Sequence, residues 1–142
     1  MTVDPMDVDG VLAVGRQDPA PWDGLPGNTV VGHVHFTVSQ MERAVAFYRD
    51  VIGFDLMMQV PTLTAVSAGG YHHHVNLNTW AGDGAPADSD RFAGLVSWEL
   101  VVPNERDRRA LIDRLSSAGA LTQRSGATAS DPDGIPVEIA AR

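Results

Sequence analysis

The sequence contains no cysteine among its 142 residues. This absence excludes a disulfide framework, a thiolate nucleophile, an iron–sulfur cluster and a cysteine zinc site. A bound metal would therefore have to use histidine, carboxylate or amide ligands. A chain of this length can still close a hydrophobic core without disulfides or a structural metal. We therefore expect a compact domain that is held together by packing alone.

Basic residues are also scarce. The ten Lys and Arg side chains stand against eighteen Asp and Glu, which leaves a net charge of −8. Binding to a phosphate backbone depends on clustered Lys and Arg, so we expect no nucleic-acid partner. The sequence shows neither the basic and apolar regions of a signal peptide nor an apolar run near the ~18 residues of a membrane span. We therefore expect a cytoplasmic protein with no membrane partner.

Local sequence signals divide the chain into an arm and two similar halves. Residues 1–29 are dense in Pro, Gly and Asp, which is typical of an arm or linker with at most one short helix, near residues 6–14. Helices are predicted after a capping box at Ser39–Glu42 and after the cap Asn104, ending at Gly53 and Gly119. Strands are predicted at 30–38, 55–60, 63–68, 72–80, 97–102, 121–124, 127–130 and 136–141.

The two halves repeat with a constant offset. Each half has the order β-α-β-β-β, and Ser97 follows His33 by 64 positions, as Glu138 follows His74. Self-similarity of this kind constrains a fold more than any local pattern. We therefore expect an α+β fold with an arm at 1–29 and a domain at 30–142. In that domain a module at 30–80, a loop at 81–94 and a module at 95–142 are related by a pseudo-twofold axis.

All five histidines lie in two short clusters of the first module, at 33, 35 and 72–74. Side chains alternate between the two faces of a strand, so apolar residues between them would pack on the helices and leave the other face polar. This alternation places His33, His35, His72 and His74 on the polar face. Ser97, Glu99 and Glu138 take the matching places in the second module. His73 would point the other way and is interpreted as structural.

These segments resemble a known family. They are Val31–Phe36, Ser67–His74, Leu77–Trp80, Asp131–Gly134 and Val137–Ile139. The chain resembles the vicinal oxygen chelate superfamily, which includes glyoxalase I, extradiol dioxygenases and bleomycin resistance proteins. It is most similar to the C-terminal half of catechol 2,3-dioxygenase-like two-domain proteins. The resemblance implies two modules that form an open, rolled mixed sheet around a central cleft with one divalent metal.

The resemblance also implies the roles of particular residues. His33 and Glu138 would be metal ligands, and His74 would occupy the position that Glu138 fills in the other module. Two imidazoles and a carboxylate suit Fe(II), Mn(II), Ni(II) or Zn(II), and they leave positions open for a small substrate with adjacent oxygens. His35, His72 and Glu99 are the candidates for moving a proton. We also expect a homodimer.

Some residues depart from the pattern of extradiol dioxygenases and leave alternatives open. Ser97 stands where those enzymes have a His ligand, and residues 123–130 lack their supporting His and Tyr. These departures argue against catechol ring cleavage and leave a lyase or isomerase reaction open, with Glu99 as a reserve ligand. A metal-free drug-sequestering protein is the second hypothesis, because the charge of −8 would attract a cationic ligand. A degenerate half-module with a structural or partner role is the third.

Overall fold

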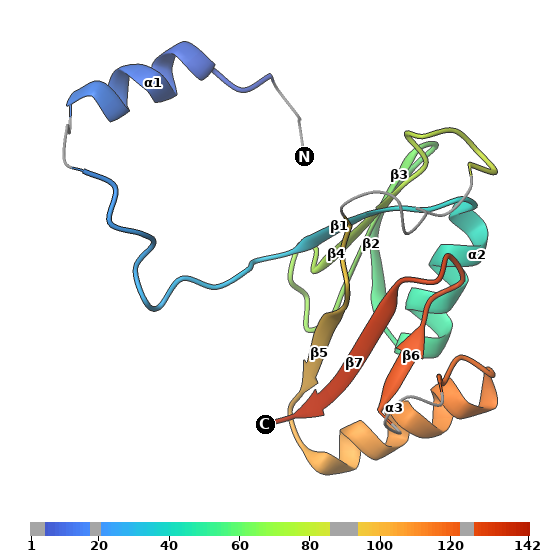
Figure 1. Ribbon diagram of the computed structural model, residues 1–142. Helices are drawn as coiled ribbons and strands as arrows, with labels where there is room; N and C mark the ends of the chain where they lie inside the picture. Colours follow the sequence, from blue (N-terminus) through green and yellow to red (C-terminus); the bar gives the residue numbers. More distant parts are fainter. Residues whose placement is uncertain (1–4, 18–20, 86–93, 123–126) are drawn as a thin grey trace. The chain divides into compact units, whose positions relative to one another are not determined.

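The computed structural model describes residues 5–17, 21–85, 94–122 and 127–142 (Figure 1). The chain divides into two units, Met1–Val30 and Val31–Arg142. In the first unit, α1 (Val8–Gln17) is an amphipathic helix with none of its residues buried. It is longer than the predicted helix at 6–14. None of the helices in the described ranges is long and apolar enough to cross a membrane.

The first module of the second unit contains one four-stranded sheet. Its strands are β1 (Val34–Thr37), β2 (Asp55–Val60), β3 (Leu63–Ser67) and β4 (Val75–Asn78). Their order is β1-β4-β3-β2, with β1 parallel to β4 and the other pairs antiparallel. The helix between β1 and β2 is confirmed as α2 (Met41–Ala46), which continues as the wider turns of η1 (Phe47–Ile52). Gly53 ends it in the left-handed conformation, at a φ of 95°.

The second module repeats this order with a smaller sheet. β5 (Trp98–Val102) lies parallel to β7 (Pro136–Ala141), and β7 lies antiparallel to β6 (Thr128–Ser130). The helix α3 (Glu105–Ser117) joins β5 to β6. Of the predicted strand at 121–124, Leu121 forms an isolated bridge with Ala129, and residues 123–126 lie outside the described ranges. The α+β fold is confirmed as an open one, with two small mixed sheets rather than a single continuous rolled sheet.

The two predicted helix caps have different outcomes. Asn104 caps α3 as predicted, because its side chain accepts a hydrogen bond of 3.0 Å from the amide of Asp107. The capping box at Ser39 is wrong, since Gln40 is the N-cap of α2 and makes no capping hydrogen bond through its side chain. Both the amide and the hydroxyl of Ser39 donate instead to Asp133 of the second module. A carboxylate from the other half of the fold thus replaces the local partner.

One hydrophobic core serves both modules. The rings of Phe36 from β1, Tyr48 from η1 and Trp98 from β5 lie 5.7 to 6.4 Å apart, centroid to centroid. Buried side chains of α3 and β7 join the same cluster; these are Leu111, Leu115, Val137 and Ile139. Each sheet therefore turns its apolar face to this core. Side chains at the alternate strand positions are directed away from it.

Polar contacts reinforce the junction between the modules. The buried hydroxyl of Tyr48 donates to Asp131 Oδ2 at 3.0 Å, while Asp131 Oδ1 accepts from the amides of Asp133 and Ile135. Burial raises the pKa of Tyr48, and the neighbouring Asp131 raises it further, so the phenol remains a neutral donor. Arg114 of α3 donates to the carbonyl oxygens at the end of η1, those of Val51 and Ile52.

Removing the Tyr48 hydroxyl should destabilise the domain. Tyr48→Phe leaves a buried carboxylate oxygen of Asp131 without its donor, so we expect the free energy of unfolding to fall by about 1–3 kcal/mol. Tyr71→Phe is the matched control, because Tyr71 is 42% exposed. Its effect should stay within about 0.5 kcal/mol. Urea denaturation of both variants measures the difference, and equal effects would contradict the role of this buried hydrogen bond.

Candidate functional site

The parallel pairing of β1 with β4 determines which polar side chains are neighbours on the first sheet. His35 pairs with Asn76 and Thr37 pairs with Asn78 on the face opposite the buried Phe36 and Leu77. His33 directly precedes β1 and is exposed. This arrangement places the chemistry-bearing side chains of β1 and β4 next to one another, as the alternation predicts.

The rings of His33, His72 and His73 form a contact group that we call the imidazole cluster. The centroid of the His33 ring lies 4.5 Å from that of His73, and the centroid of the His72 ring lies 4.2 Å from that of His73. His73 is 7% exposed, and its Nδ1 is buried with no hydrogen-bond partner among the described residues. The prediction that His73 points away from His33 is wrong, because the two rings are in contact, whereas the interpretation of His73 as a structural residue stays a prediction. β4 begins only at Val75, so the alternation does not extend over 72–74.

His74 is directed toward β3. Its Nδ1 lies 2.6 Å from Ser67 Oγ and accepts a hydrogen bond from the amide of Ala68 at 3.3 Å. Its ring also lies 4.8 Å from Tyr71 and 6.3 Å from Phe54. These contacts hold His74 at the hairpin that joins β3 to β4.

His35 lies beside the exposed Trp80. The two rings make an edge contact with centroids 4.9 Å apart, and Trp80 is 64% exposed. Burial lowers the pKa of His35, and the neighbouring His33 lowers it further. Burial also lowers the pKa of His73, with a smaller contribution from His72. Both imidazoles are thereby favoured in the neutral form, which can accept a proton.

The two asparagines of β4 differ in their partners. Asn78 donates to the carbonyl oxygen of Phe36 at 3.1 Å, and its Oδ1 accepts from the amide of Trp80 at 3.0 Å and from Thr37. Asn78 thus fastens β1 to β4 and holds the start of the following loop. The Oδ1 of Asn76 is buried and has no partner in the part of the chain that the structure describes.

The second sheet contributes carboxylates rather than imidazoles. Glu99 of β5 and Glu138 of β7 are paired in register, and both are exposed, whereas Val137 and Ile139 on either side of Glu138 are buried. Over residues 5–17, 21–85, 94–122 and 127–142, no three His, Asp or Glu side chains lie close enough to hold a metal ion. The metal set of His33, His74 and Glu138 therefore stays a prediction, as does the proton-transfer set of His35, His72 and Glu99.

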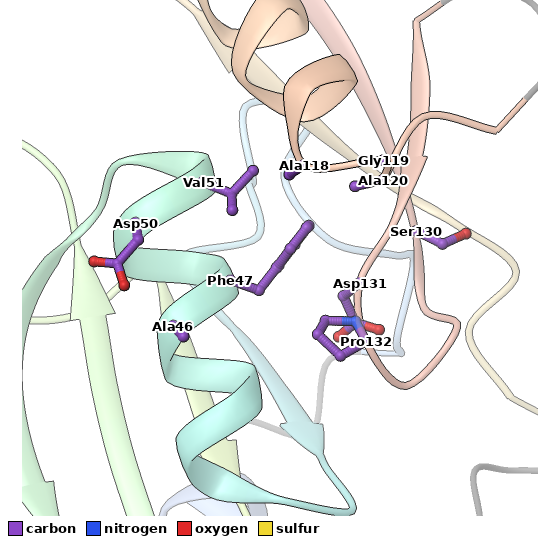
Figure 2. Close-up of a pocket in the computed structure, with 10 residues that line it drawn as sticks. All are labelled: Ala46, Phe47, Asp50, Val51, Ala118, Gly119, Ala120, Ser130, Asp131 and Pro132. Atoms are coloured by element: carbon purple, nitrogen blue, oxygen red, sulfur yellow. The ribbon is translucent and has the colours of Figure 1, made fainter.

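A groove of about 450 Å³ lies on the helix side of the domain (Figure 2). It runs between η1, the end of α3 and the turn after β6, and Phe47 projects into it. None of its lining residues is one of the predicted metal-binding or proton-transfer residues. This groove is therefore separate from the predicted site.

The duplicated α+β modules and their shared core define a fold of the glyoxalase type. The chain belongs to the Glyoxalase/Bleomycin resistance protein/Dioxygenase superfamily, whose family model matches residues 30–139. This match confirms the family resemblance that the sequence motifs indicate.

One curated relative and two solved structures illustrate the similarity. The chain is 38% identical over 121 residues to the catechol-2,3-dioxygenase of Bacillus subtilis (strain 168), covering 84% of this chain and 42% of the relative. The chain thus spans less than half the length of that protein.

A lactoylglutathione lyase from Agrobacterium tumefaciens is 17% identical, with a TM-score of 0.59 and coverage of 82% of this chain and 96% of that one. A glyoxylase/bleomycin resistance protein/dioxygenase domain from Frankia sp. EAN1pec is 21% identical, with the same TM-score, over 78% and 95%. Both structures share the fold.

The asparagine pair offers a matched test of the contacts in β4. Asn78→Ala leaves the carbonyl of Phe36 and the amide of Trp80 without their side-chain partner, so the free energy of unfolding should fall by about 1–3 kcal/mol. Asn76→Ala removes a buried amide of the same size whose Oδ1 has no partner among the described residues, so it should lower the free energy of unfolding by less. Thermal unfolding followed by calorimetry compares the two, and a larger loss for Asn76→Ala would refute this assignment.

Proposed function

We propose that this chain is a metal-dependent enzyme of the glyoxalase or extradiol dioxygenase type. It would bind a divalent metal and chelate a small substrate through two adjacent oxygens on that metal. The observation that carries this proposal is the contact between His33 and a buried imidazole whose Nδ1 lacks a partner among the described residues. The identity of 38% to a catechol-2,3-dioxygenase supports the same class of chemistry.

The donors on the two polar faces are of the type that such a metal requires. His33, an imidazole from the 72–74 string and Glu138 would be the ligands, and the sequence pattern favours His74 within that string. Two imidazoles and one carboxylate suit Fe(II), Mn(II), Ni(II) or Zn(II). A bound ion of this kind would act as a Lewis acid that makes a substrate hydroxyl more acidic.

The surrounding side chains have separate tasks in this proposal. His35 would accept the proton of the substrate hydroxyl, since a neutral imidazole is a suitable general base near neutral pH. The edge contact with Trp80 would hold the His35 ring in place, and the exposed face of Trp80 would form one wall for a flat substrate. His72 and Glu99 are the other candidates for proton transfer.

Two reaction types fit this class of site. The name of the relative suggests opening of a catechol ring with oxygen, and we propose catechols as the first substrates to test. A lyase or isomerase reaction on a substrate with adjacent oxygens is the second candidate. It is favoured by Ser97, because a serine stands where extradiol dioxygenases have a further imidazole ligand.

Metal content tests the proposed ligands. We expect the protein purified without chelators to bind close to one equivalent of divalent metal, and His33→Ala combined with Glu138→Ala to reduce this by at least about tenfold. Glu105→Ala on the exposed face of α3 is a control for the loss of a carboxylate. Elemental analysis of the three proteins provides the comparison, and equal metal content in all of them would rule out this site.

Substrate binding can be tested with isomeric diols. Catechol has adjacent hydroxyls and resorcinol does not, so only catechol should chelate the metal. We expect anaerobic catechol to change the visible spectrum of the Co(II)-loaded protein, and resorcinol to leave it unchanged. Oxygen uptake by the Fe(II)-loaded protein with catechol then separates the dioxygenase from the lyase or isomerase. An identical response to both diols would refute chelation through adjacent oxygens.

A further inference from the structure

We infer that His73, and not His74, is the imidazole that joins His33 in binding the metal. This inference rests on the proposed function and deepens it. The sequence alternation selects His74 as the second imidazole ligand, whereas the structure favours His73. Three features of the first sheet support it: the separation of the rings, the partners of each imidazole nitrogen, and the path of the chain before β4.

The separation of the His33 and His73 rings suits two ligands of one ion. Their centroids lie 4.5 Å apart, and their planes are inclined at 68°. Two imidazoles at neighbouring positions on one ion, each with a metal–nitrogen bond of about 2.1 Å, would have centroids about 4.5–5 Å apart. The separation of the two rings is therefore compatible with binding to one ion.

The nitrogen atoms of His73 and His74 differ in what they already bind. His73 Nδ1 is buried and has no partner among the described residues, which is costly unless another group satisfies it. His74 Nδ1 accepts from the Ala68 amide and lies 2.6 Å from Ser67 Oγ. The Ala68 amide can only donate, so Nδ1 of His74 is already occupied as an acceptor, whereas Nδ1 of His73 has no partner among the described residues.

The path of the chain explains why His73 lies next to His33. Gly69 and Gly70 have φ values of 66° and 74°, a left-handed conformation that side chains with a Cβ rarely adopt. The antiparallel ladder of β3 and β4 extends only to the hydrogen bond from the His74 amide to the Val66 carbonyl. The regular alternation of a strand therefore does not determine which way the side chains before His74 point. In this arrangement His74 is a positioning residue that ties the hairpin to β3.

Binding of Co(II) to the tag-free chain tests the assignment. By isothermal titration calorimetry, we expect His73→Gln to weaken Co(II) affinity at least about tenfold, and His74→Gln to change it by less than about threefold. His72→Gln is a second control, because His72 is exposed at the edge of the imidazole cluster. Weakening by His74→Gln or His72→Gln with none by His73→Gln would overturn the inference.

A spectroscopic measurement covers the case in which His73→Gln does not fold, as judged by circular dichroism. X-ray absorption of the Co(II)-loaded His74→Gln protein counts the bound imidazoles without changing His73. We expect two imidazoles, as in the unaltered chain. A count of one would show that His74 is the ligand and would overturn the inference.

The same titrations separate this inference from the proposed function. If His33→Gln and Glu138→Gln abolish Co(II) binding while His73→Gln preserves it, the metal site stands and the assignment of His73 is wrong. If the unaltered chain binds no Co(II), both the proposed function and the inference are wrong. Loss of binding in His33→Gln, Glu138→Gln and His73→Gln, with retention in His74→Gln, supports both.

Discussion

Burial of both sheets in one core is the constraint on which the rest of the structure depends. Phe36, Tyr48 and Trp98 come from both modules and pack together in that core, so neither module completes its apolar packing alone. Because the apolar positions of each strand are directed into the core, the alternate positions are directed away from it. The polar faces that carry the imidazoles and carboxylates are thus a consequence of how the core is packed.

Contacts across the junction also override local preferences. The hydroxyl of Ser39 could cap its own helix, yet it donates to Asp133, which belongs to the turn that also supplies Asp131 as the partner of Tyr48. Burial raises the pKa of Asp131 despite the amides that donate to it. The turn at 131–134 therefore joins the modules through several hydrogen bonds, and its effect cannot be seen from either half alone.

The two modules have diverged in the chemistry that their polar faces carry. The repeat has a constant offset and the same element order, but imidazoles lie only on the first module and Glu99 and Glu138 lie on the second. The family membership and the fold account for the duplication. The difference between the faces is what makes a mixed site of imidazole and carboxylate the natural proposal, because both donor types suit the same divalent metals.

The sequence by itself determined the modules, the helix stripes, the positions of most strands and the family, because these follow from periodicity, capping residues and turn residues. It also placed His35 on the polar face, since the alternation of β1 is regular. Only the tertiary structure decided that His73 lies against His33 and that His74 is bound to Ser67 and Ala68. The physical reason is that residues 72–74 precede β4, where no regular strand dictates which way a side chain points.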